Sequence, residues 1–263
     1  MDRRDGDHRE NNKGKDPEES LLAEGRNEAI EALRSGKSIE KIYMLDGAKD
    51  GASQTIRREA KKAGLRIDFV EKKRLDALST TGNHQGVIIR MAAYRYAEVS
   101  DILYRAEKKG EDPFIFLLDN IEDPHNLGAV IRTANVCGAH GVIIPKDRAV
   151  GLTAAVAKTS AGALNYTPVA RVTNLARTIE ELKEKGIWFV CADMEGESMY
   201  RQDLSGPIGI VIGSEGRGVS RLVKEKCDFI TSIPVLGEID SLNASVAAGV
   251  LAYEVVRRRS EGK

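Results

Sequence analysis

Apolar and polar residues alternate along the chain in blocks that predict two successive α/β segments. In the first segment, helical spacing and short apolar runs bounded by turn residues predict alternating helices and strands. The predicted helices span residues 27–33, 52–63 and 72–79, and the predicted strands span residues 42–45, 67–70 and 86–89. Elements that alternate in this way indicate a small α/β layer.

The second segment has a stronger pattern of the same kind. Phe114–Leu118 is an uninterrupted apolar run, which is typical of a strand buried on both faces. Further strands are predicted at 141–144, 167–172, 187–191, 208–212 and 229–233, and helices at 100–109, 127–137, 151–161, 174–185, 219–226 and 241–259. We expect a mostly parallel sheet with helices on both faces. Ligands of such sheets bind beyond the carboxyl ends of the strands, which points to the loops 119–126, 213–218 and 234–243.

Charge adds little evidence for a nucleic-acid partner. The chain has 263 residues with 40 basic and 40 acidic side chains, so its formal net charge is zero. Nucleic-acid-binding domains are often strongly basic, so an RNA-binding surface here requires local segregation of charge. Residues 20–93 carry 14 basic and 10 acidic side chains. Residues 1–19 are almost without apolar side chains and are expected to be a disordered charged tail.

Several function classes are disfavoured by what the sequence lacks. Cys137, Cys191 and Cys227 are far apart, and neither His84 nor His125 has a partner at ligand spacing, so we expect no metal site and no disulfide framework. No apolar run is long enough to cross a membrane, and the N-terminus does not resemble a signal peptide. We therefore expect a cytoplasmic protein.

The first of the three loops leads into a helix that carries two notable polar residues. Asn126 lies where the predicted helix starts, and an ordinary N-cap role would account for it. Arg132 follows six residues later on an otherwise apolar helix. A guanidinium there either reaches solvent or binds an anion, and its planar fork suits phosphate oxygens.

The other two loops have the composition of a ligand pocket. Gly213–Gly218 follows a buried strand, and its glycines allow backbone amides to approach a ligand closely. Glu215 within it disfavours a phosphate and favours a ligand with a cationic centre or ribose hydroxyls. In the third loop Ser241 is a good N-cap. Asn243 and Ser245 are poor helix formers, and they suggest a lined pocket at the edge of the sheet.

At these three segments the sequence resembles the SpoU (TrmH) family of RNA ribose methyltransferases, within the SPOUT superfamily. The resemblance is carried, in order along the chain, by Asn126–Arg132, by Ile212–Gly216, and by Ile233-Pro234 with Ser241–Ser245. Residues 21–93 resemble the substrate-binding domain of the family through Gly25-Arg26-Asn27 and Asn83-His84-Gln85-Gly86. The arrangement is most similar to members that methylate a guanosine of 23S ribosomal RNA.

The resemblance implies a complete domain organisation. Residues 20–93 would form a small α/β RNA-binding domain, residues 94–110 a linker and helix, and residues 111–259 a methyltransferase domain. Residues of roughly 210–255 would thread into a trefoil knot, which physical strand rules would not find because knots are nearly absent among folds. The family also implies a homodimer whose sites are completed by residues from both subunits.

The resemblance further implies roles for individual residues. S-adenosylmethionine would be held by the backbone of Gly213, Ile233 and Leu242. The catalytic set carried over from the motifs is Arg132, Asn126, Glu215, Ser241 and Asn243. The family proposal makes Arg132 the base, but a pKa above about 12 makes deprotonation difficult. Our hypothesis is that Arg132 binds an RNA phosphate and stabilises the developing alkoxide.

Two alternatives remain beside a 23S ribosomal RNA enzyme. A tRNA 2′-O-ribose methyltransferase is one, although members that act on tRNA often lack the N-terminal domain. A non-catalytic RNA-binding factor of ribosome assembly is the other, and the intact motifs disfavour it. The glycine spacing of residues 213–218 disfavours a generic nucleotide-binding enzyme, because it matches neither a dinucleotide fingerprint nor a P-loop.

Overall fold

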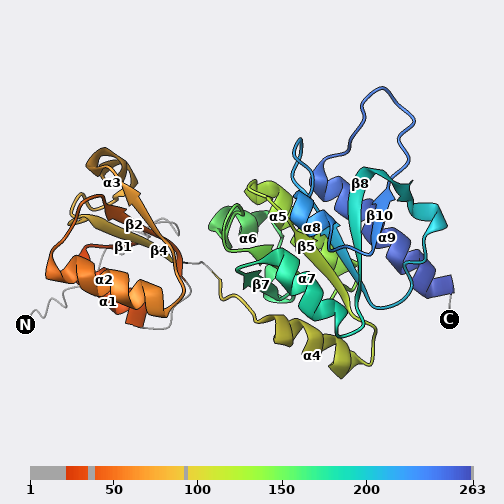
Figure 1. Ribbon diagram of the computed structural model, residues 1–263, viewed down its shortest axis with the longest axis horizontal. Helices are drawn as coiled ribbons and strands as arrows, with labels where there is room; N and C mark the ends of the chain where they lie inside the picture. The colour runs from red at the N-terminus through yellow and green to blue at the C-terminus, as the bar shows by residue number, and fades with distance from the viewer. Residues whose placement is uncertain (1–21, 35–38, 92–93, 262–263) are drawn as a thin grey trace, which may run out of the picture. The chain divides into compact units, whose positions relative to one another are not determined.

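The structure, a computed structural model, describes residues 22–34, 39–91 and 94–261. The charged tail expected at residues 1–19 lies outside this described part. The chain divides into two compact units, Met1–Ala92 and Ala93–Lys263 (Figure 1). Each has its own apolar core.

The N-terminal unit is built on a four-stranded mixed sheet with the order β1-β4-β2-β3. Strands β2 and β3 are parallel, and β4 runs antiparallel to both β1 and β2. The strands are β1 (Leu22–Glu24), β2 (Ile39–Leu45), β3 (Ile67–Val70) and β4 (Val87–Met91). Strand β1 was not predicted, because three residues are too few to show a period.

Helices cover both faces of this sheet. Helices α1 (Arg26–Arg34) and α2 (Gly51–Lys62) pack on the face that carries Ile42, Met44 and Ile89. Helix α3 (Lys72–Leu78) packs through Leu75 against Tyr43 and Ile88, which alternate with the first set along the strands and so lie on the opposite face. The expected small α/β layer is therefore present.

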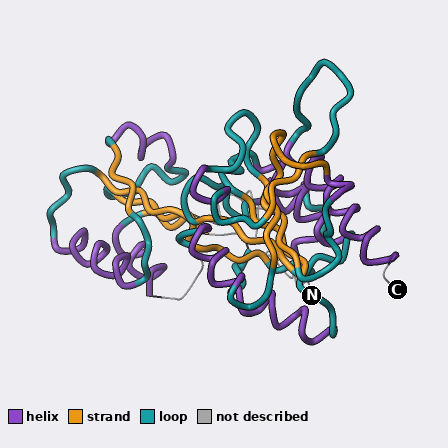
Figure 2. The backbone as a smooth tube through the Cα atoms, turned by 45° about the vertical axis from the view of Figure 1, so that its right-hand side comes forward, coloured by secondary structure: helices purple, strands orange, loops and turns teal. Residues whose placement is uncertain are grey.

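The C-terminal unit contains a six-stranded sheet with the order β10-β8-β9-β5-β6-β7, in which every neighbouring pair is parallel. Figure 2 shows these strands as one twisted layer between helices. The strands are β5 (Phe114–Leu118), β6 (Gly141–Pro145), β7 (Val169–Val172), β8 (Trp188–Ser198), β9 (Ile208–Ile212) and β10 (Phe229–Ser232). The predicted mostly parallel α/β sheet is confirmed.

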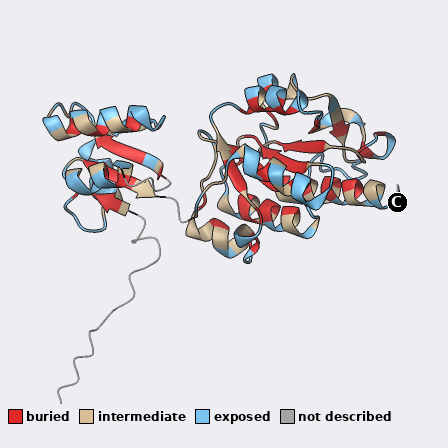
Figure 3. Ribbon diagram, turned by 90° about the horizontal axis from the view of Figure 1, so that it is seen from below, coloured by how far each residue is buried: buried red, intermediate tan, exposed pale blue. Residues whose placement is uncertain are grey.

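Side chains of the central strand β5 divide the interior into two cores. Phe114, Phe116 and Leu118 point to the core formed with helices α5 (Pro124–Val136), α6 (Ala154–Thr159) and α9 (Ala244–Glu261). Ile115 and Leu117 point to the core formed with α4 (Val99–Lys109), α7 (Leu175–Lys183) and α8 (Arg221–Lys224). All five side chains are buried, as the uninterrupted apolar run predicts. Figure 3 shows buried residues gathered on strands inside the unit and exposed residues on the outer sides of helices and on loops.

Strand β8 is longer than the predicted 187–191, because β10 pairs with it in two registers. Ile230 lies opposite Cys191, and after an irregularity Thr231 lies opposite Glu197. Gly196 permits this close approach: a Cβ there would lie 2.6 Å from backbone atoms of Ile230 and Thr231. The polar half of β8 is therefore held as strand by its neighbour rather than by its own apolar pattern.

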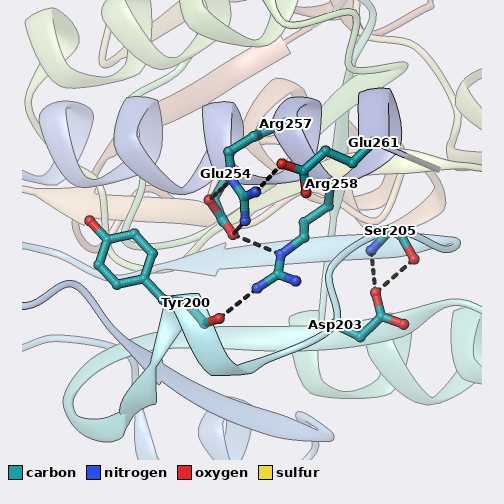
Figure 4. A network of polar contacts seen from close by, with 7 residues as sticks. All are labelled: Tyr200, Asp203, Ser205, Glu254, Arg257, Arg258 and Glu261. Atoms are coloured by element: carbon teal, nitrogen blue, oxygen red, sulfur yellow. Dashed lines mark hydrogen bonds and ion pairs between the residues drawn. The ribbon is translucent and has the colours of Figure 1, made fainter. Parts of the chain in front are cut away.

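A network of charged side chains fixes the C-terminal helix α9 to the segment that follows β8 (Figure 4). The buried Glu254 carboxylate accepts hydrogen bonds from Arg257 at 2.7 Å and from Arg258 at 2.8 Å. These bonds, led by the one from Arg257, lower the pKa of Glu254. Arg258 also donates to the backbone oxygen of Tyr200 at 2.5 Å, so the network joins elements distant in sequence.

Within the described residues, no helix combines the length and apolar character needed to cross a bilayer. The same residues contain no cluster of three or more His, Cys, Asp or Glu that could hold a metal ion.

Candidate active site

A cavity of about 420 Å³ lies beside the middle of β8, just past its last pairing with β9, and at the carboxyl ends of β9 and β10. Its walls come from residues 192–194 of β8, the 213–218 loop after β9, the end of β10 and the long loop that leads into α9. That long loop projects from the unit in Figure 1, and its Leu236 is 99% exposed. Two of the three loops selected from the sequence thus line one cavity. The loop 119–126 does not contribute to the lining.

Gly213, Ile233 and Leu242 all line this cavity, although they lie on three separate segments of the chain. Gly213 must be glycine because the chain folds back tightly behind it. A Cβ at this position would lie 2.1 Å from the carbonyl carbon of Gly218 and 2.2 Å from the nitrogen of Val219. The turn is anchored further by Asp119 at the end of β5, whose carboxylate accepts the Ser220 N–H at 2.7 Å.

Glu215 is the centre of a hydrogen-bonded cluster at the edge of the cavity. Its Oε1 accepts from Nδ2 of Asn126 at 2.9 Å and from Nδ2 of Asn243 at 2.5 Å. The Asn243 amide also donates to Oδ1 of Asn126 at 2.9 Å. One carboxylate therefore joins α5, the turn after β9 and the start of α9.

The structure corrects both N-cap interpretations made from the sequence. Helix α5 begins at Pro124, and Asp123 caps it by accepting the His125 N–H at 3.0 Å. Asn126 therefore lies in the first turn, where its side chain is free to donate to Glu215.

At α9 the predicted start at Ser241 is wrong, because the helix begins at Ala244. Oδ1 of Asn243 accepts the N–H groups of Ser245 at 3.0 Å and Val246 at 3.3 Å, which are cap interactions. The side-chain oxygen of Asn243 thus caps α9, while its side-chain nitrogen donates a hydrogen bond to Glu215. Ser241 instead lines the cavity, three residues before the helix.

Arg132 is the one predicted site residue that the structure does not bring to the cavity or to the Glu215 cluster. It lies on α5, six residues after Asn126, which is about 9 Å along the helix axis. The side chain is exposed and forms no hydrogen bond or ion pair with any part of the chain that the structure describes. A guanidinium in this state is available to an anion from outside the chain.

Sequence analysis missed the contribution of β8 to the cavity. Asp193 and Met194 line it, and Asp193 is held by Lys224 of α8 at 2.8 Å. Burial would raise the pKa of Asp193, but the hydrogen bonds from Lys224 and from the Glu195 N–H lower it. These residues follow the predicted strand 187–191 closely, so the rule that ligands bind beyond the ends of parallel strands could have found them.

The lining of the cavity suits a ligand that is partly apolar and partly cationic. Its apolar part is formed by Ile212, Ile233, Val235, Leu242, Ala244 and Ala247. Its carboxylates are those of Asp193, Glu215 and Asp240, and Arg217 is the basic residue among the described lining. Small-molecule sites are usually concave, mainly apolar and furnished with a few placed polar groups. A nucleoside that carries a cationic centre matches this set.

Family models match both units of the chain. Residues 113–253 match the SpoU rRNA Methylase family, and residues 22–97 match the model described as RNA 2′-O ribose methyltransferase substrate binding. The chain therefore belongs to the SpoU family, and the resemblance seen in the sequence is confirmed.

Similar proteins agree with this membership over nearly the whole chain. YacO of Bacillus subtilis strain 168, named as a TrmH family tRNA/rRNA methyltransferase, is 53% identical over 90% of this chain and 95% of its own. A Staphylococcus saprophyticus protein of the same family name is 47% identical over 92% and 97%. The crystal structure of the SpoU methyltransferase AviRb from Streptomyces viridochromogenes, in complex with AdoMet, matches with a TM-score of 0.59 at 24% identity, covering 92% of this chain and 91% of AviRb.

Proposed function

We propose that this protein transfers a methyl group from S-adenosylmethionine to a ribose 2′-hydroxyl of RNA, and that the RNA is 23S ribosomal RNA methylated at a guanosine. Family membership supports RNA methyl transfer, and the named relatives cover both tRNA and rRNA. The observation that carries the proposal is the single cavity lined by Gly213, Ile233 and Leu242, with the Glu215 cluster at its edge.

The residues of the cavity fit S-adenosylmethionine. When bound, the cofactor would supply an activated methyl group on a sulfonium, a cationic centre that the nearby carboxylates favour. Gly213 has no side chain, so the backbone of its turn can contact the cofactor directly. The apolar side chains that line the cavity suit the adenine ring. Asn126 and Asn243 hold Glu215 in place, so the site is ordered before substrate arrives. Such positioning is worth roughly 7–11 kcal/mol of the barrier in well-oriented reactions.

Arg132 would act on the RNA side of the reaction. Its exposed guanidinium would bind a phosphate next to the target ribose and stabilise the negative charge that develops on the 2′-oxygen as its proton passes to solvent water. Arg132→Lys tests this role because it keeps the charge but removes the planar fork. We expect methyl transfer to fall by at least about tenfold while cofactor affinity, measured by calorimetry, stays unchanged. Wild-type transfer by this variant would contradict the role.

We further propose a homodimer in which Arg132 serves the cavity of the partner subunit, together with a trefoil knot formed by residues of roughly 210–255. In support, Arg132 does not line the cavity of its own chain. Exposed apolar side chains also lie on the packed helices α5 and α9, at Val136, Val246 and Tyr253. These side chains would supply apolar area to an interface.

Subunit complementation tests the shared site. Arg132→Ala and Glu215→Ala proteins should each be inactive alone. A randomly mixed, refolded sample should recover about a quarter of wild-type activity, because half of its dimers are mixed and each mixed dimer holds one intact site. No recovery in a sample shown to contain mixed dimers would refute the shared site.

The substrate is tested by mapping 2′-O-methyl marks on ribosomal RNA and tRNA in a deletion strain. Loss of one 23S guanosine mark, restored by the wild-type gene and not by Arg132→Ala, is the expected result. Loss of a tRNA mark instead would establish the tRNA alternative. Unchanged marks, together with no heat on titration with S-adenosylmethionine, would favour a non-catalytic assembly factor.

A further inference from the structure

A second cavity, of about 550 Å³, lies within the N-terminal unit. It is formed between the start of α1 and the turn that precedes β4. Its lining is mainly polar and includes Arg26, Asn27, Thr80, Thr81, Asn83 and Gln85. A space of this size accommodates a nucleotide-sized group.

One wall of this cavity is held by a buried carboxylate. Glu24 accepts hydrogen bonds from the hydroxyls of Ser79, Thr80 and Thr81 and from the backbone N–H of Thr80. Burial would raise the pKa of Glu24, but these bonds outweigh it and lower the pKa to about 2. The hydroxyls therefore already have an ionised partner in the protein, and they shape the cavity rather than select its occupant.

The guanidinium of Arg26 is likewise held by the protein. Its Nε donates to the backbone oxygen of Gln85 at 3.3 Å, and its Nη2 lies 3.0 Å from the carboxylate of Asp50. Arg26 thus ties the start of α1 to the turn before β4. A free fork would favour a phosphate or the two acceptors of guanine, but two directions of this fork are already occupied.

Besides Glu28, whose Oε2 accepts the Glu24 N–H at 3.2 Å, the groups left to contact an occupant are side-chain amides. Those of Asn27 and Asn83 are exposed and form no hydrogen bond within residues 22–34, 39–91 and 94–261. The Gln85 oxygen accepts the Arg26 N–H at 3.4 Å, while its amide nitrogen forms no hydrogen bond with those residues. Gln85 has a φ of 49°, a left-handed conformation that is rare for a residue other than glycine. An amide presents a donor beside an acceptor, which pairs with N6 and N7 of adenine.

The loop before α2 connects this cavity to a second surface that suits the rest of an RNA strand. Asp50, the partner of Arg26, is the N-cap of α2. Arg57 of α2 donates to the oxygen of Ala48 in the same loop and lies 4.8 Å from the ring centre of Phe69, which is 47% exposed. An exposed ring under a guanidinium provides stacking and charge without base selection.

We propose that this cavity takes one unstacked adenine base of the RNA substrate, read by the amides of Asn27, Asn83 and Gln85. This inference rests on the proposed function in that the substrate is RNA. The adenine must lie in a loop or single strand, because a base that is paired and stacked in a helix cannot enter the cavity. The N-terminal unit would then select the position of the RNA, while the C-terminal unit performs the chemistry.

The test measures RNA binding by the full chain without cofactor. Fluorescence anisotropy compares three short labelled RNAs: an oligouridylate, the same strand with one central adenosine, and the same strand with 7-deazaadenosine, which lacks the N7 acceptor. We expect the adenosine strand to bind at least about fivefold tighter than the oligouridylate, and the 7-deaza strand to lose most of that gain. Equal affinity for the first two strands would overturn the proposal.

Variants assign the preference to the cavity. Asn27→Ala combined with Asn83→Ala should bind all three strands with the same affinity, because the amides that distinguish adenosine have been removed. The matched control Asn165→Ala removes an exposed amide from the other unit and should keep the adenosine preference. A double variant that is folded by circular dichroism and retains the preference would refute the role of these amides.

The result is independent of whether methyl transfer occurs. Tritium transfer from S-adenosylmethionine to the mapped RNA is measured separately on the wild-type chain. Adenosine preference without any transfer would support the cavity and contradict the proposed activity. Transfer without adenosine preference would support the activity and contradict the cavity.

Discussion

Replacing Gly213 by alanine places a methyl carbon where the backbone of the same turn already lies. The new Cβ would stand 2.1 Å from the carbonyl carbon of Gly218. Non-bonded carbon atoms prefer separations of about 3.5–4.0 Å, so the backbone at Gly213 and the backbone at Gly218 must move apart by roughly 1.4 Å. The obstructing atoms are backbone and cannot rotate away, and the turn must therefore open and change the wall of the cavity.

The expected size of the effect follows from the cost of overpacking, typically about 1–3 kcal/mol. If this cost falls on the closed form of the turn that binds ligand, affinity for S-adenosylmethionine drops by about fivefold to more than a hundredfold. Isothermal titration calorimetry measures that affinity, and thermal unfolding of the same sample shows whether the fold survives. The loss should appear in affinity even where the unfolding temperature changes little.

Gly237→Ala is the matched control for this experiment. Gly237 lies in the loop before α9, its Cβ would meet no atom within 4 Å, and it is not among the glycines with positive φ. The same chemical change should therefore leave cofactor affinity at the wild-type value. A folded Gly213→Ala protein that binds like wild type, or equal losses in the two variants, would refute the assignment of the cavity wall.

Two stability predictions follow from buried carboxylates. The pKa of Glu24 is lowered from 4.5 to about 2, so its stabilisation is complete above pH 4.5 and is lost as the pH falls from there towards 2, by at most about 3 kcal/mol. Hydrogen exchange of the backbone amides that pair β1 with β4 should become faster at acid pH in the wild type and not in Glu24→Gln. The same pH dependence in both proteins would contradict this role of Glu24. Glu254→Gln weakens the acceptor shared by Arg257 and Arg258 and should cost about 1–3 kcal/mol in urea unfolding. A change below 0.5 kcal/mol, the usual size for a surface substitution, would show that the network contributes little.

The sequence predicted most clearly those elements whose environment is uniform. Phe114–Leu118 is apolar at every position because both faces of β5 are buried, so its strand was evident without tertiary information. The polar half of β8 could not be predicted in this way. Asp193 to Ser198 belong to the strand because β10 pairs with its end, at Glu197 and Ser198, in a shifted register. The partner of Glu197 is Thr231, 34 residues later in the sequence, so local pattern could not reveal the pairing.

The candidate site shows the same division between local and tertiary information. Gly213 and Glu215 could be selected because glycines and a carboxylate directly follow a buried strand. The cap of α9 was misplaced at Ser241, since Ser and Asn are both good caps and the contact of Asn243 with Glu215 is tertiary. Arg132 was selected for its solitary charge on an apolar helix, and its position away from the cavity depends on how α5 packs.

The three side chains of the Glu215 cluster are separated by 89 and 28 residues along the chain, and the outer pair by 117. Contacts of such sequence separation form late in folding, because the entropy of closing large loops must be overcome first. During translation, Asn243 is the last of these three residues to be synthesised. A polypeptide that ends before Asn243 lacks the residue that joins the start of α9 to Glu215 and Asn126, so the cluster cannot form in it.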